Sequence, residues 1–406
     1  MDREIVGPAC HPAEAFKQEL PFSRAVRSGD MIWLSAEGDF GHGSPRPVRV
    51  QAAHCLSALS ASLAEVGADL TDLTKLLVFF RSDEATESEV LGALAFALPP
   101  NACPAITALP VPYLPYPGCS ILVEGIAMRA ADGTPLARHR IATPEMASHP
   151  APFSQGIRCG KMIFLSAQWA SLEGTVAAPG DIVSQTRQLM RQLSAGLATC
   201  GAGFGDVVKI NRWYLGHGTV EDFEPAALAC AAHFTEPGPA ATGIPLPAMA
   251  QAGEMIRIEM VAMLGEDGAH LPRRHAWPDS LWDWTTSLPY HHGLKCHDMI
   301  FLGGQVSLDK QGRAVDPNQL AAQTRTAMGH IEAILSDLGA TPADIVKLTT
   351  MYEGPSGLPA LRESLLPRAE RFTAPGPATT EIAQPALAYP GMIIEIDAFA
   401  MTEPDH

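Results

Sequence analysis

Arg257 and Glu259 are charged residues whose spacing indicates a shared place in the fold. They belong to the segment MIRIEMVAM, in which the period-2 alternation of a strand puts Met255, Arg257 and Glu259 on one face and Ile256 and Ile258 on the other. A buried arginine at such a position can form an ion pair with Glu259 or with an acid of a neighbouring unit.

A cluster of His291, His292, Cys296 and His297 is the one local group with ligand types that suit a metal. In the hairpin predicted there, alternation sends His291 and His292 to opposite faces. No HExxH, EF-hand or paired-cysteine motif accompanies the cluster. We therefore predict no metal site, and we expect His292 or His291 to carry a proton in a pocket.

Lys75, Lys209 and Lys347 recur at one position of three similar apolar segments, DLTKLLVFF, DVVKINRWYL and DIVKLTTMYE. A buried lysine with a lowered pKa could form a Schiff base or activate a serine. The alternative is a structural ion pair.

Composition narrows the classes of protein and partner. The 406 residues suggest two to three domains, and a formal charge of −16 makes nucleic acid and anionic membranes poor partners. No apolar run is long enough to span a bilayer, and the N-terminus lacks the pattern of a secretion signal. Eight isolated cysteines favour reduced thiols. We expect a cytoplasmic protein.

The residues named above belong to three copies of one repeated unit. The segments PFSRAVRSGDMIWLSAE, PFSQGIRCGKMIFLSAQ and PYHHGLKCHDMIFLGGQ begin at Pro21, Pro152 and Pro289, and the same succession of features follows each. The succession predicts a β-hairpin, a long helix, a strand, a second helix and closing strands, in α+β layers. We place the three units at 1–130, 131–264 and 265–406. Linkers fall near 131–151 and 265–288, and the tryptophans of the second linker form either a strap against a neighbouring unit or a lid.

The repeated pattern P-[YF]-S-Q, S-[GA]-Q, D-[IV]-V-K, G-P-A and a closing [IV]-E-x-x-A strand resembles the Rid family, also called YjgF or reactive-intermediate deaminases. The resemblance spans nearly the whole chain. It implies chorismate-mutase-like units that pack as trimers with pockets between neighbours, here as a single-chain pseudo-trimer, with a higher oligomer left open. It also implies hydrolysis of enamines and imines without a cofactor, and it makes the recurrent lysines part of a general pattern, which favours the ion-pair interpretation.

The three repeats retain the family's functional residues to different extents. The family's carboxylate-binding arginine follows Pro-Ala, where this chain has Ile106, Ala241 and Thr379. The family's water-orienting glutamate maps to Leu122, Arg257 and Glu395. Its tyrosine maps to Phe22, Phe153 and Tyr290, and its serine maps to Ser35, Ser166 and Gly303, the last followed by Gly304 and Gln305.

We therefore expect the third repeat to carry the chemistry, with Glu395, Glu381 and Tyr290 as catalytic groups, and the first repeat to be structural. Two carboxylates in one pocket could divide acid and base roles, although Glu381 could also be a solvated loop residue. Substrate-binding candidates are Arg257, Ser166, Gly303, Gly304, Gln305, Thr379 and His292. Arg257 could replace the missing arginine as an anion clamp.

These residues predict a hydrolase for an imine, enamine or related conjugated small carboxylic acid. Whether the protein is an enzyme stays open, because the missing arginine also suits a non-catalytic metabolite-binding or regulatory protein. A different lyase or carbon–nitrogen hydrolase on the same fold is a further alternative. The family's older endoribonuclease label fits poorly with the charge of −16.

Overall fold

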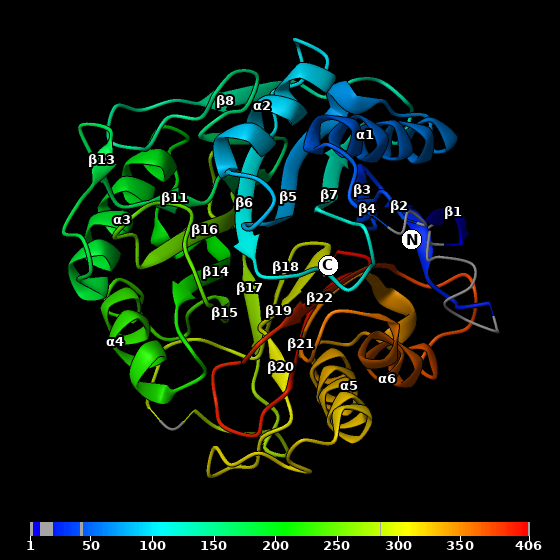
Figure 1. Ribbon diagram of the computed structural model, residues 1–406, viewed down its shortest axis with the longest axis vertical. Coiled ribbons are helices and arrows are strands. Elements are labelled where there is room, and N and C mark those ends of the chain that lie inside the picture. The colour runs from blue at the N-terminus through cyan, green and yellow to red at the C-terminus, as the bar shows by residue number, and fades with distance from the viewer. Residues whose placement is uncertain (1–2, 9–18, 41–43, 285, 405–406) are drawn as a thin grey trace.

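The computed structural model describes residues 3–8, 19–40, 44–284 and 286–404. Three units with the same succession of elements follow one another along the chain and form a ring (Figure 1). The first runs through β2 (Ser23–Ser28), β3 (Met31–Leu34), β4 (Glu37–Gly38), α1 (Val48–Glu65), β5 (Leu73–Arg81), α2 (Glu87–Ala97), β6 (Ala105–Val111) and β7 (Ile121–Met128). The predicted order of hairpin, helix, strand, helix and closing strands is thus confirmed.

The other two units repeat this order. The second contains β9 (Gly156–Cys159), β10 (Met162–Leu165), β11 (Gln168–Trp169), α3 (Ile182–Ala198), β14 (Val207–Leu215), α4 (Val220–Ala231), β15 (Ala240–Leu246) and β16 (Ile256–Met263). The third contains β18 (Gly293–Cys296), β19 (Met299–Leu302), β20 (Gln305–Val306), α5 (Leu320–Asp337), β21 (Ile345–Glu353), α6 (Leu358–Ala369), β22 (Ala378–Gln384) and β23 (Ile394–Met401). A 3₁₀ turn precedes the long strand of each unit, at Leu70–Asp72, Phe204–Asp206 and Pro342–Asp344.

An additional strand precedes each hairpin and pairs with it. β1 (Arg3–Pro8) pairs with β2, β8 (Arg138–Ile141) with β9, and β17 (Arg273–Ala276) with β18, all antiparallel. Both predicted linkers therefore contain an edge strand that the sequence analysis did not include. The short ribbon β12 (Ser171–Leu172) and β13 (Thr175–Val176) extends the second unit.

Within each unit the long strand lies between a parallel and an antiparallel neighbour. β5 pairs with β6 and β7, β14 with β15 and β16, and β21 with β22 and β23. The helices cover the outer face of these sheets (Figure 1), and α3 buries Leu189, Leu193 and Leu197 at helical spacing against its sheet. The opposite faces of the sheets are directed toward the centre of the ring.

Equivalent backbone contacts join the units in cyclic order. Ser154 pairs with Ala105, His291 with Ala240, and Ser23 with Ala378. Each contact joins the hairpin of one unit to the strand that follows Pro-Ala in the preceding unit. The three units consequently form a single-chain pseudo-trimer, with interfaces between the first and second, second and third, and third and first repeats.

The three recurrent lysines form ion pairs across these interfaces. Lys75 Nζ lies 2.5 Å from Glu259, Lys209 Nζ 2.8 Å from Asp397, and Lys347 Nζ 2.9 Å from Glu124. The lysines are buried, and each also donates to a threonine of its neighbouring strand, namely Thr107, Thr242 and Thr380. The ion-pair interpretation is confirmed, and these lysines have no free role as nucleophiles.

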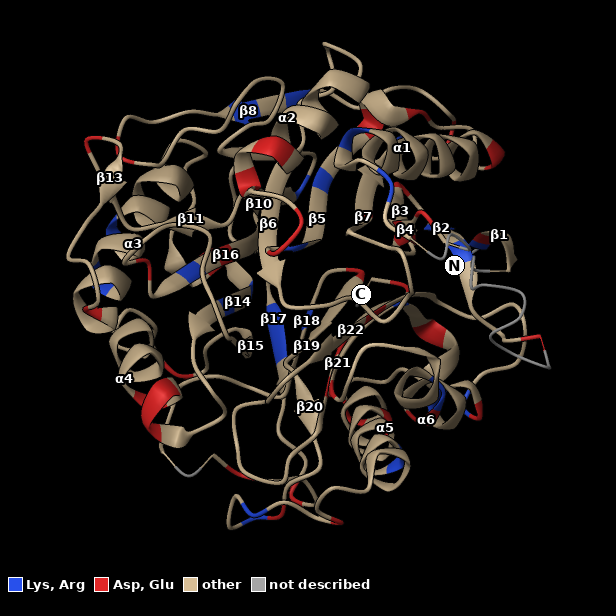
Figure 2. Cartoon of the chain, in the orientation of Figure 1, with Lys and Arg blue, Asp and Glu red and all other residues tan. Residues whose placement is uncertain are grey.

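Charged residues of both signs lie inside the ring and at its rim. Figure 2 shows basic residues on β5 and β14 and acidic residues on helices and loops at the rim. The central cavity is lined by Lys75 and by four carboxylates, Glu124, Glu259, Glu395 and Asp397. In the part of the chain that the structure describes, no helix has the length and apolarity needed to cross a membrane.

Candidate active site between the second and third repeats

Each interface between repeats holds one buried arginine, and the three come from different elements. Arg257 lies on β16 at the first–second interface, Arg212 on β14 at the second–third interface, and Arg368 on α6 at the third–first interface. Their exposed fractions are 2%, 2% and 0%. They differ in how many of their five N–H donors are already used.

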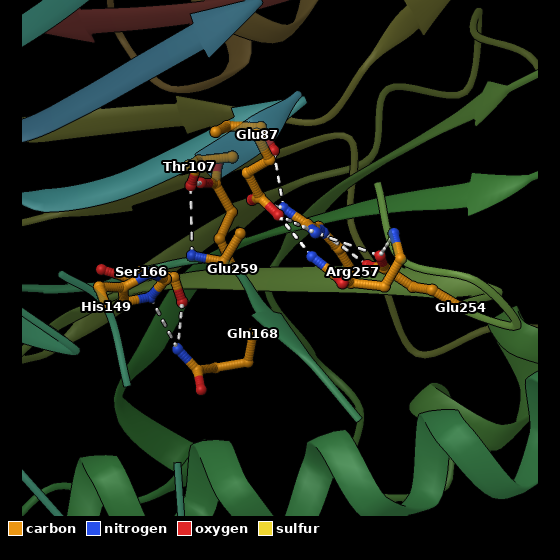
Figure 3. A network of polar contacts seen from close by, with 11 residues as sticks. Glu87, Thr107, His149, Ser166, Gln168, Glu254, Arg257 and Glu259 are labelled. Carbon is orange, nitrogen blue, oxygen red and sulfur yellow. Dashed lines mark hydrogen bonds and ion pairs between the residues drawn. The ribbon is translucent and has the colours of Figure 1, made fainter. Parts of the chain in front are cut away.

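At the first–second interface, Arg257 is fully bound by protein groups (Figure 3). Its Nε donates to Glu254 at 2.5 Å, and Nη2 donates to Glu254 at 3.1 Å and to Glu87 at 2.9 Å. Its Nη1 donates to Glu87 and, at 2.8 Å, to the carbonyl of Ala108. All five donors are used, so Arg257 in this state cannot bind an external anion.

Ser166 has a structural role at the same interface. Its hydroxyl donates to the Ser154 carbonyl at 2.6 Å and accepts from the Ile106 amide at 2.8 Å. Ser35 makes the matching bonds at the third–first interface, to the Ser23 carbonyl and from the Thr379 amide. These serines join adjacent repeats through the backbone.

At the third–first interface, Arg368 is partly bound. Its Nη1 lies 3.3 Å from both Thr379 and Glu381, and its Nε donates to the carbonyl of Ser364 at 3.2 Å. Tyr116 of the first repeat donates to Glu381 at 3.3 Å. Glu381 is 3% exposed and lies on β22, so the interpretation of a solvated loop residue is wrong.

At the second–third interface, Arg212 has no hydrogen-bond partner among the described residues for any of its three guanidinium nitrogens. Its guanidinium carbon lies 5.2 Å from the ring centroid of Phe223 and 5.0 Å from that of Tyr290, which belongs to the third repeat. Aromatic faces stabilise a cation but leave its N–H groups unsatisfied. Arg212 therefore has its full donor set available for an acceptor such as a carboxylate.

Two glycines make room for this arrangement. A Cβ at Gly243 would lie 3.0 Å from the Phe223 ring and 3.4 Å from Arg212 Nη2, so the absence of a side chain lets both groups approach β15. A Cβ at Gly304 would lie 2.0 Å from the Glu395 carboxylate, which accepts a hydrogen bond from the Gly243 backbone. Gly243 thus lies beside both groups, with Arg212 on the side where a Cβ would stand and Glu395 at its backbone.

Burial sets the ionisation of this site. It raises the pKa of Glu395 to about 8, with the same direction from Asp397 and opposition from Lys209 and Arg212. The pKa values of Tyr214 and Tyr290 are raised well above the ordinary value, mainly by burial. At neutral pH the site accordingly combines a cationic arginine with a mostly protonated carboxyl group, which is a suitable environment for an anion.

The second linker forms the outer wall of the site. Trp284 stacks on Phe223 with ring centroids 6.1 Å apart, and Trp282 is buried with its Nε1 donating to Gln305 at 3.3 Å. The carbonyl of Trp282 also contacts His292 Nε2 at 2.9 Å. This packing across two repeats agrees with the strap interpretation. A surface pocket lined by Trp277, Trp284, Tyr290 and His291, among others, lies beside the site and shares Tyr290 with it.

The structure divides the predicted site residues among all three interfaces. Tyr290, His292, Gly303, Gly304, Gln305 and Glu395 lie at the second–third interface. Arg257 and Ser166 lie at the first–second interface, and Thr379 and Glu381 at the third–first interface. His292 and Gln305 hold the strap, and burial lowers the pKa of His292 to about 4, so its imidazole is neutral.

The expectation that Glu381 and Glu395 share one pocket is wrong. Thr350 on β21 is paired with Glu381 on one side and Ile396 on the other, so Glu381 and Ile396 lie on one face of the sheet. Glu395, one residue earlier, lies on the opposite face. Glu381 contacts α6 through Arg368, whereas Glu395 lines the central side of the ring.

Arg212 is the functional candidate that the sequence did not single out. An arginine between apolar strand positions is itself a signal, because a lone buried charge is costly. The alternation of β14 separates Arg212 and Tyr214 from Asn211 and Trp213, which line the central cavity. No group of three or more His, Cys, Asp or Glu residues in the described ranges could hold a metal ion.

The three units pack around a ring like the subunits of a trimer. This is the arrangement expected for the family that the sequence resembles, here within a single chain. The family model described as Endoribonuclease L-PSP matches residues 12–129, 145–264 and 284–402, and the chain belongs to this family, with three tandem copies. It is 27% identical over 115 residues to a RutC family protein of Pyrococcus abyssi, which covers 28% of this chain and 87% of the relative. It is 29% identical over 131 residues to the protein DfrA of Myxococcus xanthus, covering 32% and 97%.

A comparison with solved structures extends the likeness to most of the chain. A chorismatase crystal structure aligns with 81% of this chain and 93% of its own, with a TM-score of 0.53 and 14% sequence identity. A protein of the YjgF/YER057c/UK114 family from Mycobacterium tuberculosis aligns with 32% of this chain and all of its own, with a TM-score of 0.28 and 25% identity. The first match supports the fold of the whole ring; at 14% identity it does not identify a substrate.

Proposed function

We propose that the second–third interface binds a small conjugated carboxylic acid that carries an imine or enamine, and that the protein hydrolyses its carbon–nitrogen bond. One observation carries this assignment. Arg212 is buried and has no bonded acceptor, and it lies beside Gly243, whose backbone donates a hydrogen bond to Glu395. A substrate carboxylate that accepted two parallel bonds from Arg212 would satisfy a group that is otherwise costly to bury.

Glu395 carries out the proton transfers in this proposal. The protonated carboxyl group first donates to the imine nitrogen, or to the enamine carbon, which makes the neighbouring carbon electrophilic. The resulting carboxylate then takes a proton from water as the water oxygen bonds to that carbon. Glu395, now protonated again, donates that proton to the amine nitrogen of the tetrahedral intermediate. The carbon–nitrogen bond breaks and its electron pair leaves with nitrogen as ammonia, while the hydroxyl proton returns to Glu395 and a keto acid remains.

The test measures ammonia release from imino acids generated in situ, with aliphatic and aromatic side chains, by the wild type and three variants. We expect Arg212→Met to raise KM by about 30-fold or more, since a charge-assisted bidentate interaction contributes about 2–5 kcal/mol. We expect Glu395→Gln to lower kcat by about 10²–10⁴-fold with little change in KM. Glu381→Gln, at the third–first interface, is the matched control and should leave both constants unchanged.

Two results would overturn the assignment. Turnover by Glu395→Gln equal to that of the wild type would remove Glu395 from the chemistry. Carboxylate binding that survives Arg212→Met would move the site elsewhere. Saturable binding of the acids by the wild type without ammonia release would assign the pocket to metabolite capture instead.

A further inference from the structure

The first–second interface contains a carboxylate held in the manner of a ligand. Glu87, the first residue of α2, reaches from the first repeat to Arg257 of the second, and its two oxygens bind Nη1 and Nη2 of the guanidinium. Gln251 Nε2 also donates to Glu87 at 3.1 Å. This bidentate geometry is the one that arginine uses to recognise free carboxylates.

We infer that the first–second interface is a second carboxylate-binding site whose occupant is the chain's own Glu87. Figure 3 shows Glu87 and Glu254 approaching the guanidinium of Arg257 from different sides. Glu254 is fully buried and belongs to the same repeat as Arg257, so it is the internal counter-ion. Glu87 comes from another repeat, and 13% of its side chain is exposed, so it occupies the side nearer to solvent.

The other repeats do not supply such an occupant. At the same distance before the Pro-Ala motif, the second repeat has Asp222 and the third has Ala360. Asp222 accepts from the His217 amide at 2.8 Å and so caps its own loop, and Ala360 has no carboxylate. The self-occupied state is therefore specific to the first–second interface, and this inference does not depend on any activity at the second–third interface.

The surrounding charges favour a monocarboxylate as the external ligand. With Glu87 removed, Arg257 keeps Glu254 on one side and the Ala108 carbonyl, and it presents Nη1 and Nη2 to the vacated side. Gln251 adds an amide donor at the same place. A second negative charge would face Glu254 and Glu259 without a further cation, since Lys75 is already paired with Glu259.

The experiment is a thermal titration of Glu87→Ala with sodium propionate, with propionamide as the uncharged analogue. We expect propionate to raise the Tm of Glu87→Ala saturably, by about 1–3 °C at ten times its dissociation constant, while propionamide has no effect. Glu221→Ala removes an exposed glutamate from the matching start of α4 and is the control. It should resemble the wild type, in which propionate has only the Arg212 site, and its Tm should rise less than that of Glu87→Ala.

The inference fails if propionate leaves the Tm of Glu87→Ala unchanged, or if it raises the Tm of Glu221→Ala by the same amount. Glu87→Ser covers the case in which Glu87→Ala does not fold. It keeps a small hydrogen-bonding group at the helix start and removes the carboxylate. Formate should raise the Tm of Glu87→Ser more than that of the wild type, and an equal response would also contradict a carboxylate site.

Discussion

The guanidinium carbon of Arg212 lies 5.0 Å from the ring centroid of Tyr290, and the two residues belong to different repeats. Tyr290 occupies the position held by Phe153 and Phe22 in the other repeats. Phe22 likewise lies under an arginine of the preceding repeat, 5.8 Å from Arg368. An arginine therefore covers the same aromatic position at two interfaces. It comes from β14 at the second–third interface and from α6 at the third–first interface.

Replacing Arg212 should not destabilise the protein. An unpaired buried charge opposes folding, so Arg212→Met should leave the free energy of unfolding unchanged or raise it by about 1–3 kcal/mol. Arg257→Met should lower it by about 3–5 kcal/mol, because Glu254 and Glu87 would lose their cation. Urea titrations of both variants, followed by far-ultraviolet circular dichroism, compare the two. A large loss in Arg212→Met would show that this arginine is a structural group.

Glu395 should make stability fall as the pH rises. A glutamate in the unfolded chain titrates near about 4.3, whereas the folded-state pKa of Glu395 is about 8, chiefly because of burial. Between these values the folded state holds the additional proton, so stability falls as the pH rises from about 4.3 to about 8 and is then constant. Glu395→Gln cannot ionise, so its Tm should exceed that of the wild type increasingly from about pH 5 to about pH 8, and the difference should level off above about pH 8. Glu363→Gln, an exposed site on α6, should track the wild type.

Gly304→Ala should impair the site without unfolding it. The new Cβ would lie 2.0 Å from a carboxylate oxygen of Glu395 and 2.7 Å from its carboxyl carbon, so the carboxyl group must move. We expect kcat for the imino acid substrates to fall by about 10-fold or more, because small displacements of a proton-transfer group are costly. Gly329→Ala on α5, with nothing within 4 Å, is the control. Equal kcat values in the two variants would contradict the proposed position of Glu395.

The lysine pairs should contribute to the closure of the ring. Lys209→Met leaves Asp397 buried at an interface without its cation and should cost about 3–5 kcal/mol. Adding Asp397→Leu should recover most of that loss, since two apolar residues can replace a buried pair. A double-mutant cycle measured by urea unfolding gives the coupling energy. Additive effects of the two substitutions would show that the ion pair is not coupled.

The repeated pattern was sufficient to predict the fold, because local signals agreed three times over. The hairpin, the long helix that buries Leu189, Leu193 and Leu197, and the lysine in each long strand are all present in the predicted order. The alternation assigned to Arg257 and Glu259 is also confirmed, since Ile256 and Ile258 face the helices. Such features depend on neighbours along the chain or on one strand pairing.

The composition of the site could not be predicted to the same extent, because it depends on which residues meet across interfaces. Glu381 and Glu395 lie on two strands that follow one another along the chain, β22 and β23, yet their side chains lie on opposite faces of one sheet. Arg212 has room beside β15 because Gly243 lacks a side chain, and Phe223 lies at the same place. The sequence analysis did not consider Glu87, because nothing in its local sequence connects it with Arg257, which lies 170 residues further along the chain.

The ring is closed by three similar interfaces, but peptide linkers connect only two of them. The chain passes from the first repeat to the second and from the second to the third, so the third–first interface is joined by contacts alone, including the pairing of Ser23 with Ala378. Separation there does not stretch a linker, whereas separation elsewhere is opposed by a tether that keeps the partners at high local concentration. Amide hydrogens of β2 and β22 should accordingly exchange with solvent before those of the other interface strands. Transient opening of the ring should therefore expose the buried Arg368 first, while Arg212 stays buried.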